Sequence, residues 1–123
     1  MVISGYGAQP DYRIDLLVRG NLVLASLDGT TLASSRRTIL LDEQGHRLVY
    51  YFPPDDVRFD RLTLVAGKTS FCPFKGEAQY YAAISAAPAS AVAWRYPGPF
   101  AQVAAITGYV AFYQHLIFLT VQD

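Results

Sequence analysis

The sequence contains a single cysteine and no excess of charge of either sign. Cys72 has no second cysteine to pair with, which excludes an intrachain disulfide and leaves no Cys-x-x-Cys pair for zinc. Ten basic and ten acidic side chains cancel, so the chain lacks the positive charge that drives nucleic-acid binding. It also lacks a polybasic run that would hold an anionic membrane surface. We therefore expect neither a nucleic acid as the main partner nor a membrane.

Long hydrophobic runs are missing as well. No window of eighteen residues is apolar throughout, because glycine, histidine or glutamine interrupts the longest stretches, and this argues against a membrane span. Residues 1–11 have neither the basic start nor the apolar centre of a signal peptide. We therefore expect a cytoplasmic protein.

Apolar and aromatic side chains, by contrast, are abundant. Hydrophobic residues make up 52% of the chain, and they include nine tyrosines and seven phenylalanines. A chain of this length and composition is expected to form one domain over residues 1–123. Aromatic and β-branched residues favour sheet. Short apolar runs alternate with turn residues, of which Asp28-Gly29 is typical of a hairpin, so we predict two packed antiparallel sheets or a barrel.

The turn residues also place several local elements. Proline and glycine mark most of their ends. The expected elements are a helical turn at 54–57, a hairpin joining strands 62–65 and 68–71, a loop of Ala, Ser and Pro that runs to 91, a short helix at 100–106 and a closing hairpin between strands 109–112 and 116–121.

The usual catalytic motifs are incomplete. Gly67-Lys68-Thr69 resembles the end of a phosphate-binding loop, but Leu62 occupies the place of the first glycine that the loop requires. His46 and His115 are far apart in the sequence and do not have metal-ligand spacing. Neighbouring carboxylates such as Asp42-Glu43 point to opposite faces of an extended chain, so we interpret them as surface residues of turns.

Polar groups set among aromatic residues remain as candidates for a site. The segment Cys72-Pro73-Phe74-Lys75-Gly76 brings a thiol and an amine close together, between a rigid and a permissive residue. Tyr51, Trp94 and Tyr96 add two phenols and an indole, and one arginine of Arg36-Arg37 is expected to face inward. Apolar walls with a few polar groups are typical of a ligand pocket.

The same residues also have plainer structural interpretations. Trp94 and Tyr80 belong to residue types that serve more often in a core than at a ligand. Cys72 is suited to be a small buried hydrophobic residue, and Lys75 to be a solvated amine. Residue types alone therefore do not decide whether these residues form a functional site.

Several motifs taken together resemble a known family. They are Ser35-Arg36-Arg37, Tyr51-Phe52-Pro53 with Asp56-Val57, Cys72-Pro73-Phe74-Lys75-Gly76, Ala93-Trp94 with Tyr96-Pro97, and the closing run from Ile106 to Phe112. In this order they resemble the bacterial family called domain of unknown function four-two-seven, which is filed under a nucleotidyltransferase-like name. The resemblance covers Leu22 to Val121. Residues 1–20 form a lead-in outside it, loose over 1–10, with Tyr6 and Tyr12 as the aromatic side chains available to anchor it.

The resemblance implies a mainly β, β-tent-like architecture, with two antiparallel sheets packed at a steep angle over a pocket and, from the residues, one or two short helices. Relatives of that architecture hold zinc through paired Cys-x-x-Cys motifs, which this chain lacks, so no metal is carried over. The chain also has no Asp-x-Asp for magnesium and no Gly-Ser phosphate motif, so the nucleotidyltransferase-like name gains no support from its residues.

The resemblance favours a small-molecule-binding pocket centred on Lys75, with an anionic or aromatic ligand. Basic members of the pocket would neutralise charge and aromatic members would stack on a planar group. One alternative is an enzyme of unknown reaction that uses the Lys75 amine or the Cys72 thiolate. Another is a homodimeric interaction protein with an exposed aromatic surface. The residues single out no cofactor. The ligand-binding candidates are Arg37, Tyr51, Lys75, Tyr80, Trp94 and Tyr96.

Overall fold

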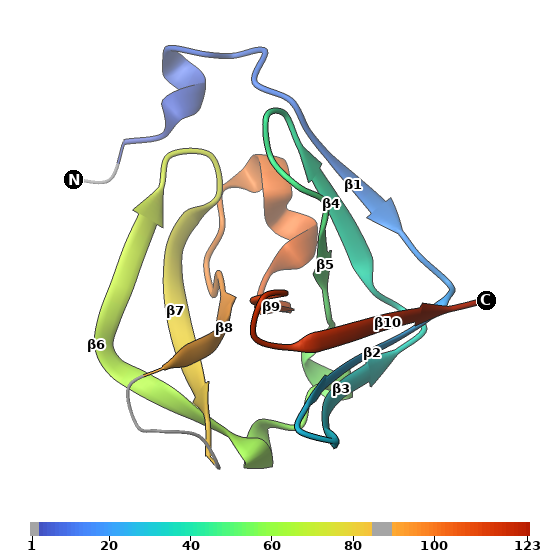
Figure 1. Cartoon of the computed structure of the whole chain (residues 1–123). Coiled ribbons are helices and arrows are strands. Elements are labelled where there is room, and N and C mark those ends of the chain that lie inside the picture. Colours follow the sequence, from blue (N-terminus) through green and yellow to red (C-terminus); the bar gives the residue numbers. More distant parts are fainter. Residues whose placement is uncertain (1–2, 85–89) are drawn as a thin grey trace.

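The strands form three antiparallel sheets in the part of the chain that the computed structural model describes, residues 3–84 and 90–123 (Figure 1). The first sheet has the order β1-β4-β5, with strands at Ile14–Val18, Ile39–Glu43 and Val49–Tyr51. The second has the order β10-β2-β3, with strands at Phe118–Gln122, Leu22–Leu27 and Thr30–Ser35. The third has the order β6-β7-β8-β9, with strands at Leu62–Cys72, Gly76–Ala83, Ala91–Arg95 and Val110–Phe112. The 3-10 helices are η1 at Gly5–Gly7, η2 at Pro54–Asp56, η3 at Phe59–Arg61 and η4 at Ala101–Ile106.

The predicted class, mainly β with antiparallel strands and short helices, is confirmed. Asp28 and Gly29 have φ angles of 49° and 81°, as the tight turn of the β2–β3 hairpin requires. The described strands form three sheets where two were expected, and β3 and β4 belong to different sheets because no ladder joins them across residues 36–38. No helix in the described ranges has the length and apolarity needed to cross a membrane.

Two of the predicted hairpins are wrong. Strand β6 runs without a break from Leu62 to Cys72, and Gly67, with a φ of 76°, lies where its register with β7 shifts between Leu64 and Thr69. The positive φ of Gly67 therefore marks an irregularity within a long strand and not a turn that reverses the chain. The closing strands do not pair with each other either, because β9 pairs with β8 and β10 pairs with β2. The expected Ala/Ser/Pro loop lies mostly at 85–89, outside the described residues.

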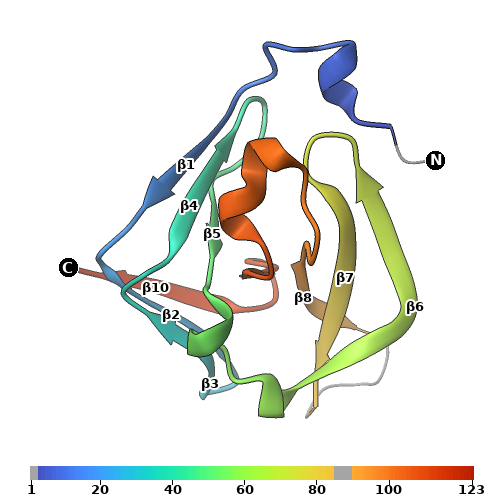
Figure 2. The same ribbon diagram turned by 180° about the vertical axis from the view of Figure 1, so that it is seen from behind.

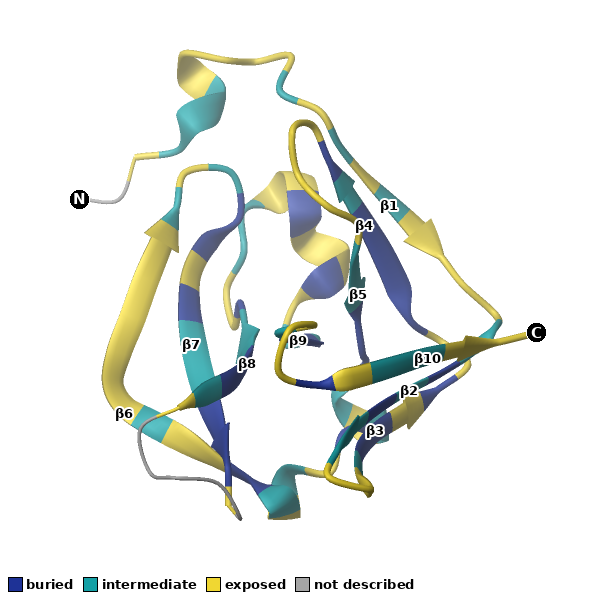
Figure 3. Ribbon diagram, viewed as in Figure 1, coloured by how far each residue is buried: buried dark blue, intermediate teal, exposed yellow. Residues whose placement is uncertain are grey.

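Two hydrophobic cores share the four-stranded sheet. The first joins that sheet to β2 and β3, for example through Val23 and Tyr81. The second joins it to β4, β5 and η4, and it includes Leu41, Tyr51 and Ile106. Figure 3 shows the buried segments of β4 and β7 facing the interior, while most of β6 is exposed. The four-stranded sheet therefore holds the other two sheets in place.

Residues 3–13, which we call the N-terminal strap, cross the turn between β6 and β7 (Figures 1 and 2). The Gly5 amide donates to the Pro73 carbonyl at 2.8 Å, and the Tyr6 hydroxyl donates to the Phe74 carbonyl at 2.8 Å. The ring of Phe74 stacks on Tyr12, with centroids 3.6 Å apart, and makes a T-shaped contact with the ring of Tyr6. The expectation of a loose lead-in is wrong for these residues, because both tyrosines anchor it.

Gly5 tests how closely the strap is packed. A Cβ at Gly5 would lie 2.7 Å from the Phe74 ring, whereas a Cβ at Gly7 would meet nothing within 4 Å. We expect Gly5→Ala to lower the free energy of unfolding by about 1–3 kcal/mol, the usual cost of overpacking. Gly7→Ala is the matched control and should leave it nearly unchanged. Urea unfolding measures both, and equal effects of the two substitutions would contradict the packing described.

Candidate functional site

A cleft of about 190 Å³ lies where the β1-β4-β5 sheet faces the four-stranded sheet. Its wall is mostly aromatic, and its charged groups come from the β4–β5 hairpin and the β6–β7 turn. The structure brings five of the predicted site residues together here. The lining residues are Leu41, Glu43, His46, Arg47, Val49, Tyr51, Lys75, Tyr80, Trp94, Tyr96 and Tyr113.

A buried ion pair between Lys75 and Glu43 lies in this cleft. The Lys75 ammonium donates to Glu43 Oε1, and the two side chains are only 11% and 5% exposed. The other carboxylate oxygen, Oε2, accepts a hydrogen bond of 2.5 Å from the Tyr12 hydroxyl of the strap and lies 3.6 Å from His46 Nε2. Glu43 is therefore held by the β6–β7 turn on one side and by the strap on the other.

The backbone of the β6–β7 turn explains why Lys75 points at Glu43. The Lys75 amide donates to the Cys72 carbonyl at 3.3 Å, and the Lys75 carbonyl accepts from the Phe100 amide at 3.0 Å. Gly76 has a φ of +122°, and a Cβ there would lie 3.4 Å from the Gly98 carbonyl oxygen. That distance is an ordinary contact, so the positive φ is what favours glycine here, because a side chain in this backbone conformation would be strained.

The ion pair sets the protonation of its neighbours. Burial acts to raise the pKa of Glu43, but hydrogen bonds from Lys75 and Tyr12 and the charge of Lys75 outweigh burial and leave that pKa below its ordinary value. Burial and the hydrogen bond to Glu43 raise the pKa of Tyr12 to about 12. At neutral pH, Glu43 is therefore a carboxylate and Tyr12 is a proton donor.

The aromatic wall is neutral and internally bonded. The Trp94 indole donates to the Tyr51 hydroxyl at 3.2 Å, and the Trp94 and Tyr113 rings lie 4.7 Å apart. Burial raises the pKa of Tyr51 and that of Tyr96. The Tyr96 hydroxyl has no hydrogen-bond partner among residues 3–84 and 90–123, so it is available to a ligand.

Two predicted candidates lie outside the cleft lining. Arg37 is 63% exposed and bonds Asp56 at 3.2 Å, and Arg36 is exposed too, so the expectation that one of these arginines faces inward is wrong. Cys72 is half-buried against the second core. In the described ranges no three His, Cys, Asp or Glu side chains gather as a metal site would require.

Glu43 is the residue that sequence reasoning missed, because we interpreted it as a surface residue of a turn. That interpretation is wrong, since Glu43 is buried at the end of β4. The signal was the two-residue period of the strand, which places position 43 on the same face as Ile39 and Leu41. His46, Arg47 and Tyr113 were also not predicted as site residues.

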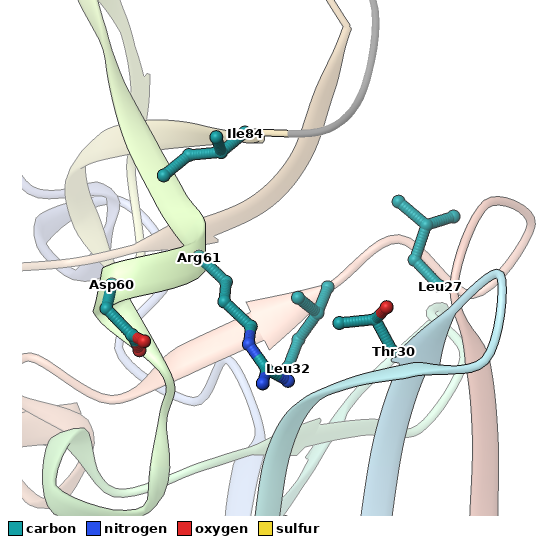
Figure 4. A pocket seen from close by; sticks show the side chains of 6 residues that line it. All are labelled: Leu27, Thr30, Leu32, Asp60, Arg61 and Ile84. Carbon is teal, nitrogen blue, oxygen red and sulfur yellow. The ribbon is translucent and has the colours of Figure 1, made fainter.

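A second pocket lies between the β2–β3 hairpin and the segment from η3 into β6 (Figure 4). Its polar groups are already bonded within the protein. The Arg61 side chain extends towards Thr30 and Leu32, and its guanidinium donates to the Thr31 carbonyl at 2.8 Å. Asp60 pairs with Arg58 at 3.1 Å. This pocket therefore offers a ligand fewer free hydrogen-bond donors than the Lys75 cleft does.

The fold and the site define a class of protein: an antiparallel β domain with an aromatic-walled cleft around a buried Lys–Glu pair. The chain belongs to the family described as "Domain of unknown function (DUF427)", filed as NTP_transf_9, whose model matches residues 15–123. The predicted resemblance is thereby confirmed, although the match also includes residues 15–20, which we placed outside it. The whole strap, residues 3–13, precedes the matched region. No curated protein matches the chain.

The Lys75–Glu43 pair makes a measurable prediction about stability. Glu43→Gln or Lys75→Met alone leaves one charged group buried without its partner, and we expect each to cost about 3–5 kcal/mol. The double variant should cost less than the sum, because it leaves neither charge behind. A double-mutant cycle of urea unfolding measures the coupling, with the exposed Arg58–Asp60 pair as a control that should show much less. Additive losses at Lys75 and Glu43 would contradict the buried pair.

Tyr12 makes a second prediction, which concerns pH. The folded-state pKa of Glu43 is lowered, so its ionisation adds stability above the ordinary range of glutamate, about pH 4.3, and this stability is lost as the pH falls through the folded value. Tyr12→Phe keeps the stacked ring and removes one stabilising donor. We expect the pKa of Glu43, followed by NMR, to rise, and the destabilisation to be larger at pH 7 than at pH 3.

The matched control is Tyr6→Phe, because Tyr6 donates to a backbone carbonyl that does not titrate. Its cost should be the same at both pH values. An unchanged Glu43 pKa in Tyr12→Phe would show that the hydroxyl does not stabilise the carboxylate.

Proposed function

We propose that the Lys75 cleft binds a small aromatic molecule that carries a hydrogen-bond acceptor. The observation that carries this proposal is the state of the Lys75 ammonium. It has three N–H donors, and within the described part of the chain Glu43 is its one hydrogen-bond partner. Donors that line a cleft and have no protein acceptor favour a ligand oxygen in that position.

The aromatic wall supports a planar ligand. Tyr80 and Trp94 are cross-strand neighbours on β7 and β8, and Tyr113 packs against Trp94. Aromatic rings of this kind give a planar molecule large apolar contacts with few rotatable bonds. The cleft, at about 190 Å³, is smaller than the sites of roughly 300–1,000 Å³ that hold drug-sized ligands. A ligand with one ring system suits this volume.

Binding has more support here than covalent catalysis does. A lysine in contact with a carboxylate is suited to act as a cation and hydrogen-bond donor. Cys72, the other nucleophile considered, does not line the cleft. A thiol would need access to the ligand to react with it. We therefore assign Lys75 the role of a ligand donor.

Trp94 allows a direct test, because it is the single tryptophan of the chain and lines the cleft. We expect its fluorescence to change on titration with one-ring aromatic acids, for which benzoate, 4-hydroxybenzoate and nicotinate are the probes. The double variant Glu43→Gln/Lys75→Met should bind about tenfold more weakly or worse, the effect of losing a hydrogen bond to a charged group. Isothermal titration calorimetry confirms each dissociation constant.

Arg36→Gln is the control for the loss of one positive charge, because Arg36 is exposed outside the cleft lining, whereas Lys68, the only other lysine in the sequence, lies 4.9 Å from the ring of the wall residue Tyr80. Arg36→Gln should bind the probes as the wild type does. The proposal is wrong if no probe perturbs Trp94 at millimolar concentration, or if the double variant binds as tightly as the wild type.

A further inference from the structure

The cleft continues beyond the Lys75–Glu43 pair. A neighbouring hollow of about 160 Å³ shares Arg47, Val49, Trp94 and Tyr113 with it. The hollow then extends along the chain from Phe112 through His115. The two hollows therefore adjoin, with Trp94 and Tyr113 in the wall that they share and Lys75 lining the first hollow only, and we call the pair of hollows the groove.

Arg47 lies at that boundary and stands out among the arginines. Its side chain is exposed on the β4–β5 hairpin, and its guanidinium has neither a hydrogen bond nor an ion pair to residues 3–84 and 90–123. Among the other described arginines, Arg36 also has neither a hydrogen bond nor an ion pair, but it lines neither hollow, and the rest are engaged. Arg37 and Arg58 pair with aspartates, and Arg61 bonds a backbone carbonyl. A guanidinium that lines both hollows without a protein acceptor is available to a ligand.

The charge balance of the groove favours an anion at this point. Glu43 is the one carboxylate among the described residues that line the two hollows, and Lys75 already balances it. The positive charge of Arg47 is left over. His46 and His115, which line the first and second hollows, add nitrogen donors near it and no negative charge. Positive potential in a cleft with apolar walls attracts a negative group.

We infer that Arg47 forms an anion subsite of this groove and that the ligand is an aromatic carboxylate with a second oxygen. The ring lies along Trp94 and Tyr113, the carboxylate bonds the Arg47 guanidinium, and the second oxygen accepts from Lys75. This inference rests on the proposed function and adds the ligand class and its direction in the groove. Arginine suits the role because its planar fork matches a carboxylate with two parallel hydrogen bonds.

A matched pair of probes separates the charge from the shape. 4-Hydroxybenzoate and 4-hydroxybenzamide have the same ring and hydroxyl, and only the first is an anion at neutral pH. We expect the wild type to bind the acid about tenfold more tightly than the amide, as one charge-assisted contact predicts. Arg47→Gln should abolish this preference and keep the affinity for the amide. Trp94 fluorescence and calorimetry measure both constants.

Arg36→Gln is the control for the loss of one positive charge, because Arg36 is exposed and does not line the groove. It should leave the preference intact. If the wild type binds acid and amide equally, or if Arg47→Gln retains the preference, the Arg47 subsite is wrong while the proposed function stands. If neither probe binds to the wild type, this inference is wrong, and the proposed function falls with it when benzoate and nicotinate fail to bind as well.

Discussion

The buried contact between Lys75 and Glu43 is the constraint on which the site depends. Removal of either charge from water costs several kcal/mol per ion, so such a pair persists only where geometry and extra hydrogen bonds compensate. The β6–β7 turn supplies the geometry, through Gly76 and the bond from Phe100. The strap supplies an extra hydrogen bond, from Tyr12 to the second carboxylate oxygen. The Glu43 carboxylate is therefore held both by the local conformation of the β6–β7 turn and by a contact from the distant strap.

This arrangement gives the N-terminal strap a part in the site that the family match does not cover. The matched region, 15–123, contains both members of the ion pair, whereas Tyr12 precedes it. Phe74, next to Lys75 in the chain, is held between Tyr6 and Tyr12. The motif Cys72–Gly76 is thus stabilised from outside the region that defines the family. In this chain the environment of Lys75 depends on residues that a family comparison does not include.

Local signals predicted much of the fold and part of the site, and their limits are physical. The Asp28-Gly29 turn was predictable because its residues tolerate positive φ. Gly67 gave the same local signal, but it lies at an irregularity inside β6, because the pairing of β6 with β7 on both sides of Gly67 keeps the strand continuous. The partners of β9 and β10 depend on which sheets bury their apolar faces. Glu43 was missed for a similar reason, because a buried carboxylate is recognisable only beside its partner, and Lys75 is 32 positions away.

The sharing of one sheet by two cores has a consequence for how the molecule opens. Strand β7 contributes Ala78 to the core beside the cleft and Tyr81 and Ala83 to the other. A fluctuation that separates either core must therefore disturb a strand that the other core also holds. Segments of a protein that open locally do so as cooperative units, and here one such unit includes the whole length of β7. The wall of the cleft that contains Tyr80 is therefore tied to both cores, and it cannot open without disturbing a strand that each of them holds.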